Sequence, residues 1–362
     1  MKTMQLVPAM EQGGVERGVV EMNRAIVAGG WENTVVSAGG RLAADIVADG
    51  GRHVTLDVKS KNPLTFFSRA SKLRRLLETE RPDVVCAHSR VPAWLFRWAN
   101  RRLGIKWITF AHGANSVSRY SAVMTRGDLI VTPSQYIADY LKANYSFDES
   151  RIRVIPRAID KSKFDIDRLD GAFVEEKRRE WGIDGKFVVM GLGRITALKG
   201  YDNLIRAVAS LDGRFKLVIV GEAEKLRKDV EASLRALVDE LGVSGRVVFA
   251  GNQLKVAECL SLADAVVSSN VRKPEAFGRS MAEALAMGKP VVAKAFGGAL
   301  DIVRDGVDGV LVRDGGGFAA AIEKVSRMSF GDLRREALER FSFEKMVERS
   351  LAVYRELSPR GA

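Results

Sequence analysis

The chain has few of the residues on which disulfide bridges and metal sites depend. Its 362 residues include 2 Cys and 3 His. Cys86 and Cys259 stand far apart in apolar runs, which predicts buried free thiols and a reducing compartment. No uncharged apolar run approaches the roughly 18–20 residues of a membrane-spanning helix, and residues 1–10 lack the basic flank and cleavage site of an export signal. We therefore expect a soluble cytoplasmic protein without a cysteine-bound metal.

Acidic residues are scarce in one part of the chain. The net charge is +12, and residues 52–126 carry fifteen Lys or Arg against four Asp or Glu. A basic region of this kind attracts nucleic acid, anionic lipid headgroups or a phosphorylated acceptor. We expect no nucleic-acid partner, because the chain has no recognition motif and no dispersed set of aromatic residues for stacking bases.

Short apolar runs alternate with helical stretches along the whole chain, which predicts βαβ units and mainly parallel sheets. The length suits two doubly wound α/β domains. Ligands of such sheets lie beyond the carboxyl ends of the strands, so we expect the domains to face one deep cleft. Residues 151–160 and the charged stretch 165–179 are expected to connect the domains. The clearest strands are expected at residues 84–87, 107–110, 129–132, 187–190, 217–220, 247–250 and 265–268.

Two glutamates stand eight positions apart in residues 274–292. Glu275 lies beside a proline and shortly before a glycine, where irregular backbone is expected, whereas Glu283 falls in an Ala-, Met- and Leu-rich run that favours a helix. The amides of residues 277–279 would then be donors at a helix N-terminus, which favours an anionic group such as a diphosphate. Two solvated glutamates are the plain alternative, but the arrangement suits a nucleotide-sugar.

A glycine loop with two cations follows the first expected strand of the second half. Gly191-Leu192-Gly193-Arg194 closes the strand, and Lys199 precedes the next helix. A guanidinium and an ammonium at one place stabilise the charge that develops on a departing diphosphate. A dinucleotide-binding loop is the weaker interpretation, because Thr196 stands where the third glycine is required.

A second glycine loop follows the first strand of the chain. Gly13 and Gly14 open a helix whose first turn contains Glu16. Small residues at this place let the backbone approach a ligand closely, although a tight turn without a ligand also uses them.

Two histidines stand where expected strands end. His112 follows residues 107–111, and His88 follows residues 84–87, two residues before Arg90. Side chains at the carboxyl ends of parallel strands often face a ligand, whereas a hydrogen-bonded structural histidine is the plain alternative. We expect His53 to be structural.

Together these motifs resemble the family 4 retaining glycosyltransferases, which have the GT-B fold. The resemblance spans nearly the whole chain, with its motifs in the expected order. It implies two Rossmann-like domains: an acceptor-binding domain over residues 1–158 with a terminal helix of about residues 343–362 crossing back to it, and a donor-binding domain over residues 159–342. Three segments look more specifically like lipopolysaccharide-core and envelope-polysaccharide transferases of Gram-negative bacteria, namely residues 13–17, 89–94 and 275–279.

The resemblance also implies roles for single residues. Glu275 would contact the donor sugar and Glu283 the ribose. Arg194 and Lys199 would grip the diphosphate, and His112 would bond the donor sugar. The catalytic set is thus His112, Arg194, Lys199 and Glu275. The donor side would be completed by Gly14, Gly193, Ala276, Phe277 and Gly278, with backbone of Gly297-Gly298 facing it, and the acceptor side would be formed by Gly13, Glu16, His88 and Arg90.

The implied reaction transfers a hexose from a UDP- or GDP-linked sugar to a saccharide or lipid-linked acceptor with retention of configuration. No cofactor is expected, and the two cations reduce the need for a metal, so we do not expect Asp165-Ile166-Asp167 to hold one. Two alternatives stay open. One is a nucleotide-sugar 2-epimerase of the same architecture, and the other is a noncatalytic sugar-nucleotide-binding or membrane-scaffolding protein.

An amphipathic helix is expected near residues 64–78. Burial of its apolar stripe against a sheet is the plain interpretation. The sharper hypothesis is peripheral contact of the segment Phe66 to Arg75 with the anionic cytoplasmic face of the inner membrane, because exposed Phe beside clustered cations suits headgroup docking. The expected stripe is Phe66, Ala70, Leu73 and Leu77, with Arg69, Lys72 and Arg75 nearby.

Overall fold

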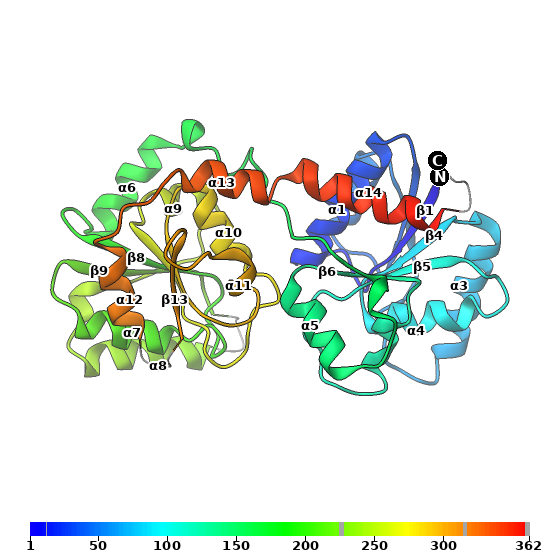
Figure 1. Cartoon of the computed structure of the whole chain (residues 1–362), viewed down its shortest axis with the longest axis horizontal. Helices are drawn as coiled ribbons and strands as arrows, with labels where there is room; N and C mark the ends of the chain where they lie inside the picture. The colour runs from blue at the N-terminus through cyan, green and yellow to red at the C-terminus, as the bar shows by residue number, and fades with distance from the viewer. Residues whose placement is uncertain (12, 224–227, 314–316, 359–362) are drawn as a thin grey trace. The chain divides into compact units, whose positions relative to one another are not determined.

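The chain forms two compact units in a computed structural model that describes residues 1–11, 13–223, 228–313 and 317–358 (Figure 1). Unit 1 consists of Met1–Arg157 and Glu344–Ala362, and unit 2 consists of Ala158–Phe343. The last helix, α14 (Phe343–Leu357), therefore packs with the first part of the chain. Residues 359–362 of the expected terminal helix lie outside the described residues.

Unit 1 contains a parallel sheet of seven strands in the order β3-β2-β1-β4-β5-β6-β7. Apolar residues fill most strand positions on both faces, because helices cover the sheet on both sides. The interior strand β1 pairs with β2 and β4, so that Thr3 stands opposite both Asn33 and Val84. The strands are β1 (Lys2–Leu6), β2 (Glu32–Ser37), β3 (Arg52–Thr55), β4 (Val84–Ala87), β5 (Lys106–Phe110), β6 (Leu129–Thr132) and β7 (Ile152–Val154).

Helices cover both faces of this sheet. In Figure 1, α1 and α14 lie together on one side of the sheet of unit 1, and α3 and α4 lie on the other. The Tyr354 ring of α14 is completely buried and meets the edge of Trp31, with ring centroids 6.4 Å apart. The helices are α1 (Gly14–Ala28), α2 (Ala43–Ala48), α3 (Phe66–Glu80), α4 (Arg90–Ala99) and α5 (Gln135–Asn144), with short 3-10 turns η1 (Ser121–Thr125) and η2 (Glu149–Arg151).

Unit 2 contains a parallel sheet of six strands in the order β10-β9-β8-β11-β12-β13. Its two halves diverge from β8 and β11, which pair at Ala265 with Val189. The neighbours of a reversal in strand order are where doubly wound sheets bind ligands. The strands are β8 (Phe187–Leu192), β9 (Phe215–Val220), β10 (Val247–Gly251), β11 (Ala265–Ser268), β12 (Val291–Lys294) and β13 (Gly309–Val312).

Helices of unit 2 bury one apolar core on each face of the sheet. Figure 1 shows α7, α8 and α12 on one face and α6, α9, α10 and α13 on the other. The helices are α6 (Gly171–Trp181), α7 (Tyr201–Ser210), α8 (Lys228–Glu240), α9 (Val256–Ser261), α10 (Arg279–Ala286), α11 (Ala299–Ile302), α12 (Phe318–Val325) and α13 (Leu333–Arg340), with 3-10 turns η3 (Ile166–Arg168) and η4 (Ser244–Arg246).

The prediction that the charged stretch 165–179 connects the domains is wrong. This stretch lies within unit 2, where most of it forms α6. The Asp170 carboxylate accepts a hydrogen bond from the amide of Phe173 and caps the helix. Trp181 at its other end is almost fully buried. One narrow apolar face thus anchors α6, and most of its remaining positions are charged. The chain passes from unit 1 to unit 2 at Arg157–Ala158.

No helix in the described ranges is long and apolar enough to span a bilayer.

Candidate functional site

In unit 2, the glycine loop after β8 is held in place by its neighbours. Gly193 has φ +131°, and a Cβ atom there would lie 3.0 Å from Cε of Lys199. The hydroxyl of Tyr201 donates to the carbonyl of Gly193. Gly200, also with positive φ, lets the chain pass the carbonyl of Ser269, which a Cβ would approach to 2.2 Å. Arg194 is an exposed residue of the same loop, so both predicted cations stand at the carboxyl end of β8.

Lys199 is paired with Glu275. The Lys199 ammonium lies 2.5 Å from Oε1 of Glu275, and the amide nitrogen of Asn270 donates to the same oxygen at 3.1 Å. Both charged side chains are only about a quarter exposed or less. The structure thus brings together two predicted residues from strand ends β8 and β11. Sequence reasoning missed Asn270, although a polar residue just after an apolar strand was a usable signal.

Two glycines clamp the backbone of Glu275. The amide of Gly298 donates to the carbonyl of Glu275 at 2.8 Å. A Cβ at Gly298 would lie 2.2 Å from the carbonyl oxygen of Phe277, and one at Gly297 would lie 2.3 Å from Pro274. The loop after β12 therefore approaches the loop after β11 more closely than any side chain allows.

The second glutamate lies on a helix, as expected. Gly278, with φ +101°, precedes α10, and Glu283 stands in the middle of that helix. The Glu283 carboxylate accepts from Nε of Arg279 at 3.1 Å. Phe277 is buried, with its ring edge-on to Phe341 at 5.7 Å, whereas Ala276 is half-buried. One carboxylate therefore lies in the loop after β11 and the other on the helix that follows this loop.

In unit 1, a side chain at Gly13 would meet the Glu16 carboxylate, whereas one at Gly14 would not. Gly13 is the N-cap of α1, and a Cβ there would lie 2.2 Å from a carboxylate oxygen of Glu16. No described heavy atom comes within 4 Å of a Cβ placed on Gly14. The Glu16 side chain folds back over the start of the helix that carries it. Gln12 of this motif lies outside the described residues.

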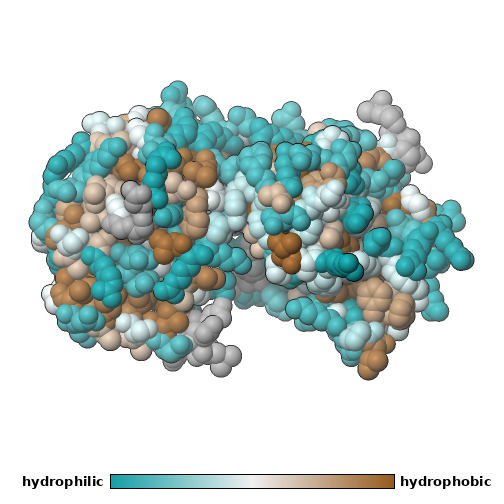
Figure 2. Space-filling model, turned by 60° about the horizontal axis from the view of Figure 1, so that its bottom comes forward, coloured by the Kyte–Doolittle hydropathy of each residue, from teal (hydrophilic) through white to brown (hydrophobic). Residues whose placement is uncertain are grey.

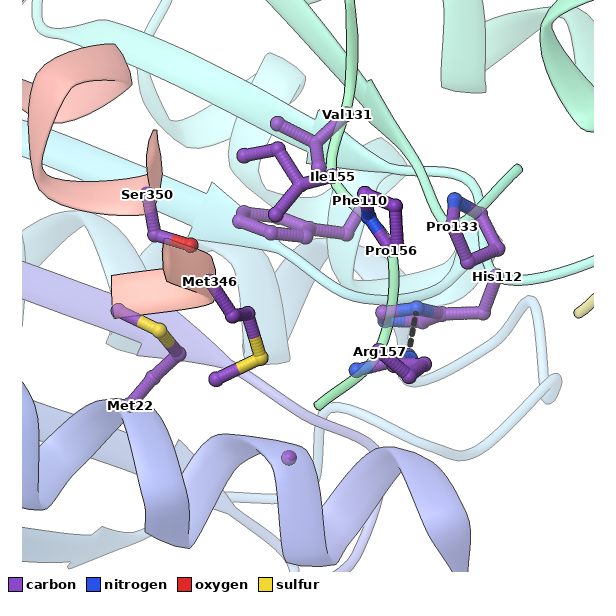
Figure 3. A pocket seen from close by; sticks show the side chains of 11 residues that line it. Met22, Phe110, His112, Val131, Pro133, Ile155, Pro156, Arg157, Met346 and Ser350 are labelled. Atoms are coloured by element: carbon purple, nitrogen blue, oxygen red, sulfur yellow. Dashed lines mark hydrogen bonds between the residues drawn. The ribbon is translucent and has the colours of Figure 1, made fainter. Parts of the chain in front are cut away.

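The two histidines are joined by hydrogen bonds. Nδ1 of His88 lies 3.0 Å from Nε2 of His112, and the rings are nearly parallel. Nε2 of His88 lies 3.0 Å from the amide oxygen of Gln5 in β1. Nδ1 of His112 lies 2.6 Å from a guanidinium nitrogen of Arg157, as Figure 3 shows. Four residues from β1 and from the ends of β4, β5 and β7 thus form one hydrogen-bonded row.

The direction of each bond in this row follows from Arg157. A guanidinium only donates, so Nδ1 of His112 accepts and its proton lies on Nε2. That N–H donates to Nδ1 of His88, whose own Nε2–H donates to Gln5. Both rings are therefore neutral. Burial and the charge of Arg157 lower the pKa of His88 to about 3 and hold the pKa of His112 well below its usual value.

The row continues into the core beside β1. The amide nitrogen of Gln5 lies 3.5 Å from Oδ1 of Asn33, and Asn33 donates to Asn23 of α1, which donates to the carbonyl of Ile46. Sequence reasoning missed Gln5 and Arg157. The signal for Gln5 was a polar residue within the apolar strand Met4 to Val7.

Arg157 also lines a small cavity of about 30 Å³ in unit 1. Figure 3 draws Met22 of α1 and Met346 of α14 among the residues that line it. A Cβ at Gly18 of α1 would lie 2.5 Å from a guanidinium nitrogen of Arg157. The missing side chain at Gly18 therefore makes room for the guanidinium against the helix.

The structure corrects the view of Arg69 as a surface cation of the basic helix. Arg69 is 6% exposed and donates to the carbonyls of Asp57 and Asn62. Burial of the apolar stripe against the sheet is confirmed for Ala70, Leu73 and Leu77. Phe67, which is not part of this stripe, is 62% exposed to solvent. On the neighbouring helix, Arg90 donates to Ser121 and lies over the ring of Tyr120.

The remaining residues weighed for metal or redox chemistry are two buried free thiols and a helix cap. Burial raises the pKa of the Cys86 and Cys259 thiols to about 12. Asp165 accepts from the amide of Asp167 and caps η3. Among the described residues, no group of three or more His, Cys, Asp or Glu is placed to hold a metal ion.

Comparison with known proteins identifies both halves of the chain. Residues 173–344 match the model of the glycosyl transferases group 1, and residues 12–163 match the model of Glycosyltransferase Family 4. The chain is 30% identical over 353 residues to the lipopolysaccharide core biosynthesis glycosyltransferase LpsE of Rhizobium meliloti, covering 91% of this chain and 90% of that one. It is 30% identical over 305 residues to a D-inositol 3-phosphate glycosyltransferase of Acidothermus cellulolyticus, covering 76% of this chain and 67% of that one.

Solved structures agree with this result. A glycosyltransferase from Rickettsia africae ESF-5 superposes with a TM-score of 0.89 at 26% identity, covering 99% of both chains. The fold is also that of Anabaena Alr3699/HepE, whose structure was solved with UDP and glucose, with a TM-score of 0.81 at 20% identity over 97% of this chain and 98% of that one. The chain has two parallel-sheet Rossmann-like units, it matches both family models, and it aligns with a relative over nearly its whole length. The chain therefore belongs to the GT-B glycosyltransferases of family 4.

Proposed function

We propose that the protein transfers a hexose from a nucleoside diphosphate sugar to a saccharide or lipid-linked acceptor with retention of anomeric configuration. The observation that carries this proposal is the Lys199–Glu275 pair at the carboxyl ends of β8 and β11, within loops whose glycines leave no room for side chains. An ammonium fixed at such a place stabilises charge that develops on a leaving diphosphate. The HepE structure with UDP supports a UDP-linked donor, and a GDP-linked donor fits the same residues.

In this proposal Arg194 and Lys199 bind the diphosphate, and Glu275 orients the sugar. Glu283 accepts hydrogen bonds from the ribose, beside backbone of Gly193, Gly278 and Gly298. The acceptor hydroxyl attacks the anomeric carbon on the face that the diphosphate leaves. The bond from that carbon to the diphosphate oxygen breaks, and the hydroxyl proton passes to the departing diphosphate. No side chain acts as a covalent nucleophile.

The hydrogen bonds of His112 support a positioning role for this residue. Its two ring nitrogens face Arg157 and His88, and its pKa is lowered well below the usual value. A neutral ring with both nitrogens engaged is a poor proton donor or acceptor at neutral pH. We propose that His112 positions the strand-end backbone of unit 1, and that it reaches the sugar only by exchanging one of these bonds. Gly13, Glu16, His88 and Arg90 are assigned to the acceptor side.

Neither a metal nor a cofactor is part of the proposed reaction. Arg194 and Lys199 supply fixed positive charge where other transferases use a divalent cation. This assignment rests on the two cations, and a chelator experiment decides it.

We further propose a cytoplasmic enzyme that contacts the anionic inner membrane through the start of α3, where lipid-linked acceptors reside. Leu64 and Phe67 are 89% and 62% exposed, and Lys72 and Arg75 are exposed on the same helix. Exposed apolar tips beside cations suit an anionic headgroup region. The match to LpsE supports an acceptor of the lipopolysaccharide core or another envelope polysaccharide.

Incubation with UDP- and GDP-linked hexoses without an acceptor separates the candidate functions. A transferase releases nucleoside diphosphate slowly by hydrolysis, a 2-epimerase converts the sugar, and a binding protein does neither. We expect slow hydrolysis, its loss in Lys199→Ala, and no effect of EDTA. Epimerised nucleotide-sugar, or activity abolished by EDTA and restored by Mg²⁺ or Mn²⁺, would overturn the corresponding part of the proposal.

A further inference from the structure

A groove of about 450 Å³ lies in unit 1 where three loops meet. Its walls come from residues 60–67 after β3, from Val91 and Trp94 of α4 after β4, and from Tyr120 after β5. All three follow carboxyl ends of parallel strands, which is the edge at which doubly wound sheets bind ligands. The groove adjoins the proposed acceptor side, because Arg90 lies 5.4 Å above the Tyr120 ring that lines it.

Aromatic rings dominate the lining of this groove. Trp94 and Tyr120 are nearly parallel, with an interplanar angle of 14° and centroids 6.4 Å apart. Phe66 and Phe67 meet edge-on across from them at 5.5 Å. Tyr120 is 40% exposed. Figure 2 shows brown, apolar surface gathered at the lower right edge of unit 1. A concave cluster of exposed rings is typical of a binding site.

The groove is rigidly built. The buried guanidinium of Arg69 donates to the carbonyls of Asp57 and Asn62 and to the hydroxyl of Thr65. It thereby fixes the loop that carries Ser60 and Lys61. On the other wall, the indole nitrogen of Trp94 donates to the carbonyl of Tyr120 at 2.9 Å. A site whose walls are held by such bonds loses little conformational entropy when a ligand binds.

Cations predominate around the groove, and one carboxylate, that of Asp57, accepts from the amide of Ser60. Residues 58–77 contain six Lys or Arg and no Asp or Glu, and residues 84–127 contain seven and none. These two segments supply all of the lining named above. Lys61 stands exposed on the polar wall. An anionic ligand is therefore favoured over a neutral or cationic one.

We propose that this groove is an acceptor subsite for an anionic saccharide, with a sugar ring against Trp94 and Tyr120 and a carboxylate or phosphate of the acceptor near Lys61. The inference rests on the proposed transferase function and specifies its acceptor class. A sugar ring has an apolar C–H face and polar edges. It thus matches a groove with aromatic faces on one side and Ser60, Lys61 and Asn62 on the other, because the face of an aromatic ring carries the negative end of its quadrupole.

The concave shape separates this subsite from the proposed membrane contact. A bilayer surface meets protruding side chains, and Leu64 and Phe67 protrude at the rim. Trp94 and Tyr120 line the inside of the groove, where one or two sugar rings fit. Substitutions at Trp94 or Tyr120 should therefore weaken saccharide binding, whereas substitutions at Leu64 or Phe67 should weaken membrane binding.

The test measures binding of two tetrasaccharides to the full-length protein without nucleotide. The anionic probe alternates glucuronic acid and N-acetylglucosamine, and the neutral probe contains N-acetylglucosamine alone. We expect tighter binding of the anionic probe, with saturation transfer to its ring protons. Tyr120→Ala should weaken both probes about 3–10-fold, as expected for one aromatic contact. Lys61→Gln should weaken the anionic probe alone. Arg126→Gln, an exposed cation outside the groove, is the matched control.

Three binding results would overturn the subsite. They are equal affinity for both probes, probe binding unchanged by Tyr120→Ala and Lys61→Gln, and Tyr120→Ala reducing only the binding to vesicles with 30% anionic lipid. Lys61→Gln alters an exposed side chain, so its result does not depend on the folding of the Tyr120 variant. Groove binding without transfer from any nucleotide-sugar contradicts the proposed function alone. Transfer that proceeds normally in both groove variants contradicts the subsite alone.

Discussion

The Lys199 ammonium and the Glu275 carboxylate, 76 residues apart in the chain, meet at 2.5 Å, and Asn270 donates to the same carboxylate oxygen. The pair compensates two charges that are both largely withdrawn from solvent. In the proposed mechanism, the diphosphate competes with Glu275 for the ammonium. The affinity for the donor would therefore depend on the difference in free energy between the Lys199–diphosphate and Lys199–Glu275 ion pairs. Substitution of Lys199 and of Glu275 tests this relationship.

Lys199→Ala and Arg194→Ala should each lower the rate of transfer by about 10²-fold or more, because one lost donor to developing charge costs roughly 3–4 kcal/mol. Lys199→Ala also leaves the Glu275 carboxylate facing the diphosphate. Donor affinity should therefore partly recover in the double variant Lys199→Ala/Glu275→Gln. Steady-state kinetics and calorimetry with UDP measure the two effects. Lys163→Ala, an exposed lysine of unit 2, is the control, and normal turnover in both single variants would refute the phosphate assignment.

Glu283→Gln should weaken UDP binding, since a carboxylate that accepts ribose hydroxyl bonds contributes about 1.5–3 kcal/mol per charged bond. Glu275→Gln should reduce turnover while the affinity for free UDP changes less, because its carboxylate faces the sugar. Calorimetry with UDP and turnover assays on both variants separate the roles. Equal losses of UDP affinity in the two variants would contradict this division.

Unit 1 should lose stability as the pH falls below about 6.5. His88 has a pKa of about 3 in the folded protein, so the unfolded chain binds more protons than the folded one between these values. The free energy of unfolding should therefore fall by about 1.4 kcal/mol per pH unit for this one residue, and its contribution is fully present only above the unfolded pKa. Urea unfolding at pH 5 to 7.5 measures the slope.

The variant His88→Gln should flatten this slope, and His53→Gln should flatten it less. Burial also lowers the pKa of His53, which is only half-buried. A slope that His88→Gln leaves unchanged would show that His88 is not the group that titrates.

Gly298→Ala should reduce transfer strongly while unit 1 keeps its stability. The added methyl would lie 2.2 Å from the carbonyl of Phe277, so the loop that carries Glu275 must move. Small displacements of positioned groups have large effects on rate. Gly213→Ala is the matched control, because no described heavy atom lies within 4 Å of its added methyl. Equal activity of the two variants would exclude the clamp from the proposed mechanism.

Binding to anionic vesicles should be reversible and should weaken with salt, because each basic side chain near the surface contributes about 1 kcal/mol and is screened over roughly 8–10 Å. Two double variants should reduce co-sedimentation, Leu64→Ser/Phe67→Ser and Lys72→Gln/Arg75→Gln. Leu254→Ser is the control, because Leu254 is the most exposed large apolar residue of unit 2 among those described. If wild type and both double variants bind vesicles equally, these exposed side chains do not mediate membrane contact.

The sequence was sufficient for the parts of the molecule that depend on local pattern. Strands β4, β6 and β11 have the expected bounds, because continuous apolar runs identify strands buried on both faces. The loop position of Glu275 and the helical position of Glu283 followed from their neighbours in the same way. The α6 helix was missed because its single apolar face is diluted by charged residues.

Features that join distant positions could not be predicted. Gln5 and His88 are 83 residues apart, and no spacing rule connects them. The burial of Arg69 was also missed, since a cation on an amphipathic helix is ordinarily solvated and only the neighbouring loop supplies its acceptors. The strand β7 has only three residues, too few for a recognisable pattern.

The membership of α14 in unit 1 inverts the usual order of folding during synthesis. Domains generally fold as the chain emerges, with the N-terminal one first. Here residues 158–343 form an uninterrupted unit, whereas unit 1 lacks the buried Tyr354 and Val353 until the segment after residue 343 has left the ribosome. The part of the chain that is made first is therefore completed last, and throughout translation of unit 2 the nascent protein exposes the apolar surface of unit 1 that α14 later covers.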